Sequence, residues 1–449
     1  MNRSAESSYT EGPLLKKLIL FTIPLMLSGI LQLLFNAADL VVVGRYAADH
    51  TALAAVGATG ALINLITNLF IGLSVGCSVS VAQYFGAKED RDVSEVVHTS
   101  IVTSIIGGVI VMAIGLLGSR TFLGWMDTPA DVIDQATLYM TIYFVGMPSV
   151  MLYNFGAAIL RSIGDTRNPL IYLSIAGVLN VFLNLYFVIA LHMGVAGVAL
   201  ATIISQTLSA ALIVIHLFRS RECYRLELKK LRIYPSKLVK ILRIGIPAGL
   251  QGTVFSISNV VIQSSVNSFG SLFMSGSTAA SNIEGFIYIA MNAFHHTALT
   301  FVGQNMGAKK YHRVTRIFLL CLLMVTVLGL VLGLSAYLAG PALLSIYCPG
   351  DAVAISYGLE RMAVIATTYF LCGMMDVMTG TLRGMGYSVV PMIITVVGVC
   401  GIRILWIYTV FAAVHTPFML FISYTISWII SFVAQGIFFL FMRRRMLRG

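Results

Sequence analysis

The apolar run from Leu18 to Gly44 constrains this chain more than any other stretch, because it is long enough to cross a lipid bilayer as a helix. It carries one acid, Asp39, near its far end. A carboxylate in a spanning helix costs about 2.5–3.5 kcal/mol on insertion scales, so such acids usually face protein or water and mark an ion or substrate path. The alternative is a structural acid that is held by an Arg from another helix.

Two further polar residues share the face of Asp39. Gln32, Asn36 and Asp39 are spaced four and then three apart, which places the three side chains on one side of a helix. Pro24, in the same run, removes a backbone hydrogen bond and favours a kink. We therefore expect a bendable helix that presents a titratable group to a cavity within the protein.

The composition excludes a soluble globular protein. Hydrophobic residues make up 58% of the 449 residues and charged residues only 10%, whereas charged residues are about a quarter of a soluble domain. The apolar segments are longer than the roughly 10-residue strands of a membrane barrel. The chain is therefore predicted to be an all-α integral membrane protein with about twelve transmembrane helices. We place these near 18–45, 53–85, 94–119, 131–156, 169–191, 195–218, 238–268, 277–306, 314–339, 351–381, 389–412 and 417–442.

The basic residues predict the orientation of these spans. All but four of the 29 Lys and Arg fall in the N-terminal tail, after even-numbered spans or in the C-terminal tail. Such asymmetry places those segments in the cytoplasm, so we expect a multi-pass protein of the cell (inner, cytoplasmic) membrane with both termini cytoplasmic. The net charge of +11 is then explained by topology and by the lipid bilayer, and no nucleic-acid partner is expected.

No motif predicts a metal site, a cofactor or an enzyme. The six cysteines are scattered through mostly apolar runs without metal or disulfide spacing, which is typical of small core residues. The histidines show no ligand spacing with acids or cysteines, and no nucleophile–base set is present.

The two halves of the chain repeat each other. Three motifs return in the same order 221 to 223 residues later: Gln83 with Gly86–Lys88 at Gln304 with Gly307–Lys309, Leu160–Gly164 at Leu382–Gly386, and Ile23-Pro24 at Ile246-Pro247. At the offset of the last match, Asn36 corresponds to Asn259. Each half has an even number of spans, so the halves are parallel six-helix repeats, and sites in such proteins lie at or near the interface of the repeats. This architecture is typical of a transporter rather than of a channel or receptor.

The repeat also predicts the domain organisation. We expect a cytoplasmic N-terminal tail at 1–17, an N-lobe at 18–218, a cytoplasmic linker at 219–237, a C-lobe at 238–442 and a basic cytoplasmic tail at 443–449.

These motifs, together with a first helix that carries Pro24 and then Asp39, resemble the multidrug and toxic compound extrusion (MATE) family over essentially the whole chain. The resemblance implies a cation site in the N-lobe, built from an acid on the first helix, two polar residues on the fifth and a hydroxyl on the sixth. Asp39, Asn180 with Asn184, and Thr202 match these positions in turn. Family members often carry Asp where Asn184 stands. The departure weakens a tight sodium site and favours a single-acid proton carrier.

Three charged residues also lie within predicted spans of the C-half, namely Glu284, Asp376 and Arg403. Since stranded charges are costly in a membrane, at least some must pair, and Arg403 with Glu284 or Asp376 is the expected pair. The other possibility is that the two acids couple ions. We interpret Glu360 and Arg361 as a local charge pair near the end of a span.

The resemblance implies export of cationic organic xenobiotics, including antibiotics, in exchange for H⁺ or Na⁺ by a monomer. The alternative within the same superfamily is a lipid-linked oligosaccharide flippase, whose cavity favours basic residues that hold phosphates. Arg403 is the basic residue that we expect to be deeply buried, which argues against the flippase.

Overall fold

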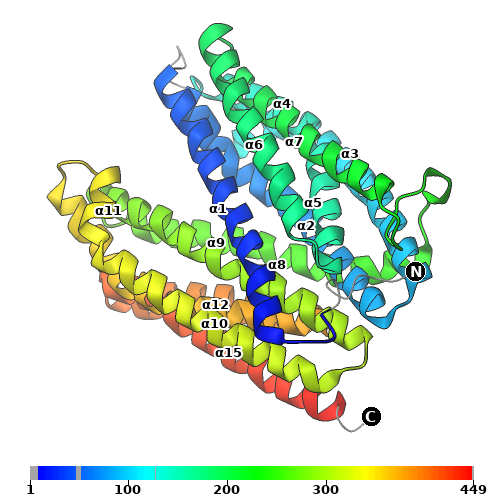
Figure 1. The fold of residues 1–449 in the computed structure, drawn as a ribbon. Coiled ribbons are helices and arrows are strands. Elements are labelled where there is room, and N and C mark those ends of the chain that lie inside the picture. The colour runs from blue at the N-terminus through cyan, green and yellow to red at the C-terminus, as the bar shows by residue number, and fades with distance from the viewer. Residues whose placement is uncertain (1–8, 47–51, 127, 447–449) are drawn as a thin grey trace. The chain divides into compact units, whose positions relative to one another are not determined.

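The computed structural model describes residues 9–46, 52–126 and 128–446, and within these ranges all regular structure is helical (Figure 1). In chain order the elements are α1 (Leu14–Tyr46), α2 (Ala52–Ala87), α3 (Asp90–Trp125), α4 (Ile133–Val145), α5 (Met147–Ile163), α6 (Arg167–Leu185), η1 (Tyr186–Ala190), α7 (Gly194–Arg219), η2 (Leu228–Lys230), α8 (Pro235–Asn267), α9 (Ser271–Gly307), α10 (Tyr311–Leu338), α11 (Gly340–Tyr347), α12 (Ala352–Gly384), α13 (Val389–Thr395), η3 (Val396–Gly401), α14 (Ile402–Trp406), η4 (Ile407–Phe411) and α15 (Pro417–Met446).

The predicted fold class is confirmed. Ten helices of the described chain are long and apolar enough to span a membrane, and the pair α4–α5, which is bent by 49°, makes an eleventh span. The 37-residue α9 is a further long helix of more polar sequence. Each of the twelve predicted segments thus corresponds to a helix or to consecutive helices.

The chain packs into two compact units. We call Leu27–Thr253 the N unit, and Tyr9–Met26 together with Val254–Met446 the C unit. The helices α1 and α8 are therefore each divided between the units, and each division follows an internal proline, Pro24 or Pro247, by a few residues. The helix α1 continues through Pro24, and the kink expected there stays a prediction. The lobe and linker boundaries expected from the sequence also stay predictions.

The two predicted tails are only partly covered. Residues 1–8 of the N-terminal tail and 447–449 of the basic tail lie outside the described residues. The N-terminal tail already becomes helical at Leu14, and Arg443–Arg445 continue α15.

The repeat predicted from sequence is visible in the backbone of each half. Lys88 and Lys309, which end the two Gly-Ala-Lys motifs, both adopt a left-handed conformation, with φ of 62° and 56°. The glycines that end the two Leu-Arg-x-x-Gly motifs, Gly164 and Gly386, are left-handed as well, with φ of 107° and 97°. Such residues end a helix and start the next turn. The motifs therefore recur because each half ends its equivalent helices in the same way.

Each unit buries apolar side chains of its own. In the C unit, the ring of Tyr9 stacks on that of Phe301 at 4.0 Å and Phe21 meets both rings edge-on. In the N unit, Cys77 and Phe155 lie in the cluster formed by α2, α3, α5 and α7. Five of the six cysteines are buried, as expected for small core residues, and Cys223 is partly exposed.

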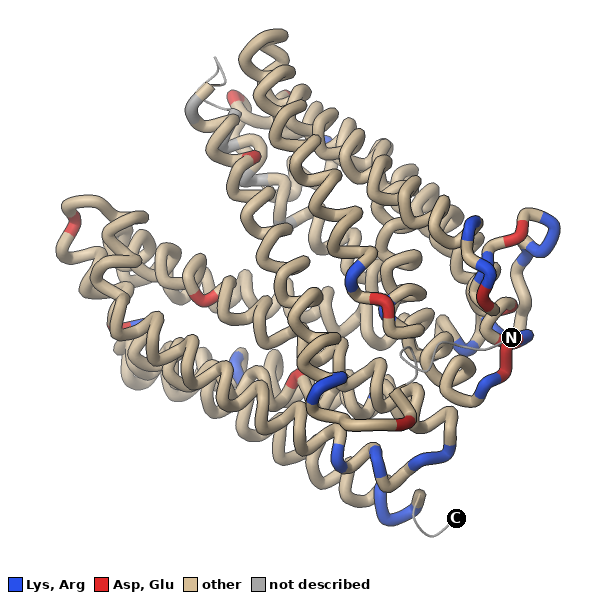
Figure 2. Tube along the Cα trace, viewed as in Figure 1, with Lys and Arg blue, Asp and Glu red and all other residues tan. Residues whose placement is uncertain are grey.

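Basic residues gather at one end of each unit, as the positive-inside rule predicts. In the N unit this is the end of the linker between α7 and α8, and in the C unit it is the end that carries the C-terminus (Figure 2). The linker is tied to α3, because the amide of Glu227 donates to Nε2 of His98 at 3.0 Å and that of Tyr234 to Oγ1 of Thr99 at 3.1 Å. The orientation of the chain in a membrane stays a prediction.

Two pairs of glycines let α2 and the first half of α8 touch within the N unit. Gly72 and Gly76 on α2 face Gly245 and Gly249 on α8, with a spacing of four residues on each helix. A Cβ atom at Gly72 would lie 2.3 Å from the Cα of Gly249, and one at Gly76 would lie 2.1 Å from the carbonyl oxygen of Ile241. Small residues at this spacing bring membrane helices into backbone contact.

We expect Gly72→Ala to lower the thermal stability of the purified protein, because a methyl group there meets backbone that cannot rotate away. Overpacking of this kind costs about 1–3 kcal/mol. The melting temperature in detergent checks it, with Gly60→Ala on the same helix as the control, since a Cβ at Gly60 meets nothing within 4 Å. Equal melting temperatures for the two variants would contradict the packing argument.

Candidate cation-binding site

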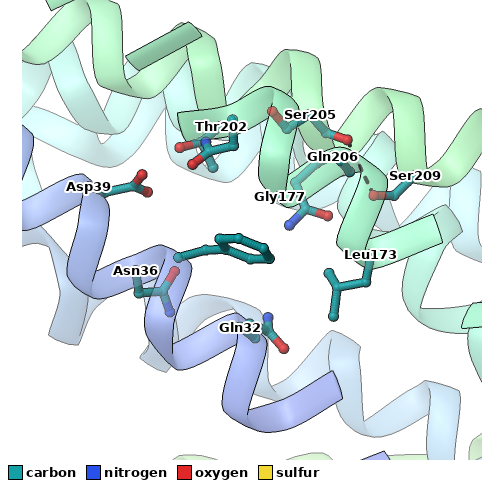
Figure 3. A pocket seen from close by; sticks show the side chains of 12 residues that line it. Gln32, Asn36, Asp39, Leu173, Gly177, Thr202, Ser205, Gln206 and Ser209 are labelled. Atoms are coloured by element: carbon teal, nitrogen blue, oxygen red, sulfur yellow. Dashed lines mark hydrogen bonds between the residues drawn. The ribbon is translucent and has the colours of Figure 1, made fainter. Parts of the chain in front are cut away.

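A pocket in the N unit collects the polar face of α1. It lies among α1, α6 and α7 and encloses about 400 Å³, its open mouth included. Its lining consists of Gln32, Phe35, Asn36, Asp39, Leu173, Ala176, Gly177, Asn180, Thr202, Ser205, Gln206 and Ser209. Figure 3 shows Gln32, Asn36 and Asp39 along one helix, opposite the hydroxyl and amide groups of α7. The cavity predicted from the spacing on the first helix is thus present.

The carboxylate of Asp39 contacts amide and hydroxyl groups. The side-chain amide of Asn184 donates to Oδ1 of Asp39 and also to Oδ1 of Asn180, the latter at 3.2 Å. The hydroxyl of Thr202 also lies close to the carboxylate and donates to the backbone carbonyl of Val198 at 3.0 Å. The structure therefore brings together all four residues that the family resemblance implied. Among the described side chains, no guanidinium contacts Asp39. The alternative of a structural acid that is held by an Arg therefore finds no support in this part of the chain.

The helix α6 supplies its amides on one face. Asn180 and Asn184 are one helical turn apart and both are buried, with 5% and 0% of their surface exposed. The carbonyl oxygen Oδ1 of Asn184 is buried beside the carboxylate and has no hydrogen-bond partner among the described residues. Carboxylate, amide and hydroxyl oxygens are the ligands that hard cations prefer. The group can therefore hold either a proton on Asp39 or a small cation.

One wall of the pocket is apolar. A Cβ at Gly177 would lie 1.8 Å from the ring of Phe35, so the absence of a side chain at Gly177 lets this ring pack directly against α6. Phe35 and Leu173 then offer a nonpolar surface next to the polar one. Pockets with this division suit organic molecules that carry a few polar or charged groups.

Three polar residues of the pocket were missed by the sequence analysis, namely Ser205, Gln206 and Ser209 on α7. With Thr202 they follow at spacings of three, four and seven, which is one stripe of an otherwise apolar helix. The same spacing rule that identified the face of Asp39 on α1 would have found them.

The remaining predicted residues are not among those that line this pocket. Pro24 belongs to the part of α1 that packs in the C unit, and Asn259 is exposed on α8. Glu284, Asp376 and Arg403 are all in the C unit, on α9, α12 and α14.

Glu284 does not pair with Arg403, so that expectation was wrong. It forms an ion pair with Arg361, at 2.8 Å between Oε2 and Nη2, and the two side chains are 3% and 9% exposed. Arg361 also donates from Nη1 to the hydroxyl of Ser277 at 3.0 Å. The predicted local pair of Glu360 and Arg361 is wrong as well. Neighbouring residues on a helix point about 100° apart, so Arg361 faces α9 while Glu360 is exposed.

Asp376 does not pair with Arg403 either. Its polar neighbours are the side chain of Asn292 and the guanidinium of Arg383, and its Oδ2 is buried without a hydrogen-bond partner among the described residues. His295 on α9 contacts the backbone carbonyl of Asp376 through Nδ1 at 2.8 Å. Asp376 thus faces α9, whereas Arg403 faces α15, which separates the two charges.

The architecture and the site agree with comparisons to known proteins. A sequence model of the MatE family matches residues 24–186 and again 247–409, which begin and end 223 residues apart. The "Probable multidrug resistance protein YoeA" of Bacillus subtilis (strain 168) is 26% identical over 398 residues, covering 87% of this chain and 85% of the relative. The "Probable multidrug resistance protein NorM" of Thermotoga maritima (strain ATCC 43589 / DSM 3109 / JCM 10099 / NBRC 100826 / MSB8) is 25% identical over 395 residues, covering 87% and 84%.

A solved structure shares the fold over the full length. "Outward-facing conformation of a multidrug resistance MATE family transporter of the MOP superfamily" superposes with a TM-score of 0.90, covers 100% of this chain and 99% of that chain, and is 22% identical. The two matches to the family model coincide with the two repeats seen in the helices. The chain therefore belongs to the MatE family, the multidrug and toxic compound extrusion transporters of the membrane.

Proposed function

We propose that this protein is a secondary active multidrug efflux transporter that exports organic cations in exchange for H⁺ or Na⁺. One observation carries the proposal: the carboxylate of Asp39 lies in a pocket within a membrane-spanning bundle, and its described hydrogen-bond partner is the neutral amide of Asn184. An acid without a fixed cation partner is available to a proton, to a small cation or to a positively charged substrate. The relatives named as multidrug resistance proteins support an organic substrate.

Exchange follows from competition for this carboxylate. Burial disfavours the charged form of an acid, so a proton or a cationic passenger stabilises it, but both cannot occupy the same oxygens. A pH gradient supplies about 1.4 kcal/mol per unit, and the membrane potential about 2.3 kcal/mol per charge per 100 mV. Antiport of this kind needs no cofactor besides the coupling ion.

The proton is our preferred coupling ion. A sodium site gains from a second carboxylate, and Asn184 supplies a neutral amide at the position beside Asp39. The acids of the C unit, Glu284 and Asp376, differ in how their carboxylates are compensated. Glu284 is neutralised by Arg361, whereas Asp376 keeps a buried oxygen without a hydrogen-bond partner among the described residues and is the better candidate for a second coupling acid.

The flippase alternative requires cations that hold phosphate groups. The pocket of the N unit contains one acid, and no Lys or Arg is among the described residues that line it. A cationic passenger therefore fits this pocket better than a pyrophosphate. We further propose that the protein lies in the cell membrane with both termini in the cytoplasm, since the basic ends of its units match the positive-inside rule. A monomer is our proposed working form.

Reconstituted transport tests the proposal. Proteoliposomes that contain the purified protein should move ethidium against its gradient when a pH difference is imposed, with sodium held equal on both sides. In the converse experiment, a sodium gradient at equal pH should move less ethidium than the pH difference does. Ethidium movement that follows neither gradient would exclude antiport, and movement with sodium alone would assign the coupling to sodium.

A further inference from the structure

The side chain of Arg403 is buried in the C unit and forms no ion pair with a carboxylate of the described residues. It is 2% exposed, and Nε donates to the hydroxyl of Ser427 at 2.9 Å. Its two terminal nitrogens make no hydrogen bond to a described residue. The groups that act on it electrostatically are Tyr424, Cys372, Cys400 and Tyr369, and no Asp or Glu is among them.

Aromatic rings partly compensate for this burial. The guanidinium carbon lies 4.0 Å from the centre of the Tyr424 ring and 5.7 Å from that of Trp428. Such cation–π contacts stabilise a buried cation, but they leave the in-plane hydrogen-bond donors of the guanidinium unused. A guanidinium whose terminal N–H groups are unused can donate two parallel hydrogen bonds to a carboxylate.

The arrangement corresponds to the cation site of the N unit with the opposite charge. At the 223-residue offset between the two family matches, Arg403 falls on Asn180, and the position of Asp39 is taken by Ile262, which is 2% exposed. The residues Ser427 and Ser431 on α15 stand 222 residues after Ser205 and Ser209, which line the pocket on α7. The C unit thus repeats the serine stripe of the N unit, but it carries a base at the position of an amide and an apolar residue at the position of the acid.

Two further features distinguish this place from ordinary packing. The hydroxyl of Ser431, one turn beyond Ser427 on α15, is buried against Gly398 of η3 and has no hydrogen-bond partner among the described residues. The backbone around Arg403 is also irregular, because the π-helical turns η3 and η4 stand directly before and after the five-residue α14. Such π-helical turns are frequent at functional sites.

We propose that Arg403, held by the hydroxyl of Ser427 beside the Tyr424 ring, forms a subsite in the C unit that binds the carboxylate of an aromatic substrate. The rings of Tyr424, Trp428 and Tyr369, with neighbouring centres 5.2 to 5.8 Å apart, supply the aromatic surface. This inference rests on the proposed transport function and extends it from plain cations to aromatic zwitterions.

Paired dyes test the subsite. Rhodamine B carries a free carboxylate beside its cationic ring system, and its ethyl ester lacks that charge. Binding of each dye to the purified protein is measured by fluorescence anisotropy, and the readout is the ratio of the dissociation constant of the ester to that of the acid. Arg403→Gln should lower this ratio about tenfold or more, since a charge-assisted bidentate contact is lost.

Arg403→Lys should lower the ratio less, because Lys keeps the positive charge but cannot donate two parallel hydrogen bonds. Asp39→Asn is the matched control, since both dyes carry the same cation and the ratio should not change. A ratio in Arg403→Gln within twofold of that of the unmodified protein would overturn the proposal, and so would an equal fall in Asp39→Asn.

A second measurement needs no variant. Naphthoate should displace rhodamine B from the unmodified protein, and naphthalene carboxamide, its neutral counterpart, should not. Equal displacement by the two compounds, or by neither, would overturn the subsite. Failure of the transport proposal is recognised separately, because gradient-driven movement of the ester would then be absent from proteoliposomes while the binding ratio still depended on Arg403.

Discussion

Proteoliposomes that contain Asp39→Asn should not accumulate a cationic dye when a pH gradient is imposed. The amide keeps the size and the hydrogen-bonding shape of the side chain but cannot exchange a proton, so dye binding and proton binding are no longer linked. With one proton exchanged per dye, a gradient of one pH unit lets the unmodified protein concentrate the dye about tenfold. The variant should reach the external concentration and go no further.

The measurement is the steady-state dye ratio across the membrane, together with the proton flux that accompanies dye movement. Asp134→Asn is a suitable control, because Asp134 is 74% exposed and pairs with Arg120 away from the pocket. Undiminished, proton-linked accumulation by Asp39→Asn would show that another group couples the ion. Asp376 would then be the next residue to replace.

The second large effect is expected at the ion pair between Glu284 and Arg361. Removing one partner of a buried pair leaves a charge without compensation and costs about 3–5 kcal/mol. Arg361→Leu should therefore lower the melting temperature strongly. Glu284 would lose all three of its hydrogen bonds to the guanidinium.

Replacing both partners separates the effect of the uncompensated charge on stability from the effect of changed packing. Glu284→Leu combined with Arg361→Leu should recover much of the lost stability, because neither charge remains in the apolar interior. Arg120→Leu serves as the control: its partner contact is equally short, at 2.9 Å, but the side chains are 68% and 74% exposed, and exposed pairs contribute about 0–1 kcal/mol. If Arg361→Leu were no less stable than Arg120→Leu, the buried pair would have no structural importance.

The helices and the face of Asp39 could be predicted because their signals are local. Twenty apolar residues in succession satisfy the bilayer only as a helix, and the spacing of Gln32, Asn36 and Asp39 specifies a common face in any helix. The two repeats were recognisable for a similar reason, since the left-handed turns at Lys88 and Lys309 need the same short motif wherever they occur.

The charge pairs of the C unit were not predictable in this way. Sequence spacing suggested Glu360 as the partner of Arg361, and the count of buried charges suggested Glu284 or Asp376 as the partner of Arg403. Which acid meets which base depends on the helix faces that pack together. The close contact of α9 and α12, where a Cβ at Gly276 would meet the carbonyl oxygen of Ala354 at 2.1 Å, brings Glu284 to Arg361 instead.

By itself the sequence determined that this chain is a helical membrane protein of two repeats, with a polar stripe and one acid on its first span. Hydrophobic length and helical periodicity suffice for the spans and the polar stripe, because both act within a single helix, and the recurring motifs suffice for the two repeats. Only the tertiary structure decided that α6 and α7 surround Asp39 with amides and hydroxyls, and that Arg403 is left with aromatic rings and a serine. These outcomes depend on contacts between residues far apart in the chain, and the contacts follow from how whole helix faces pack.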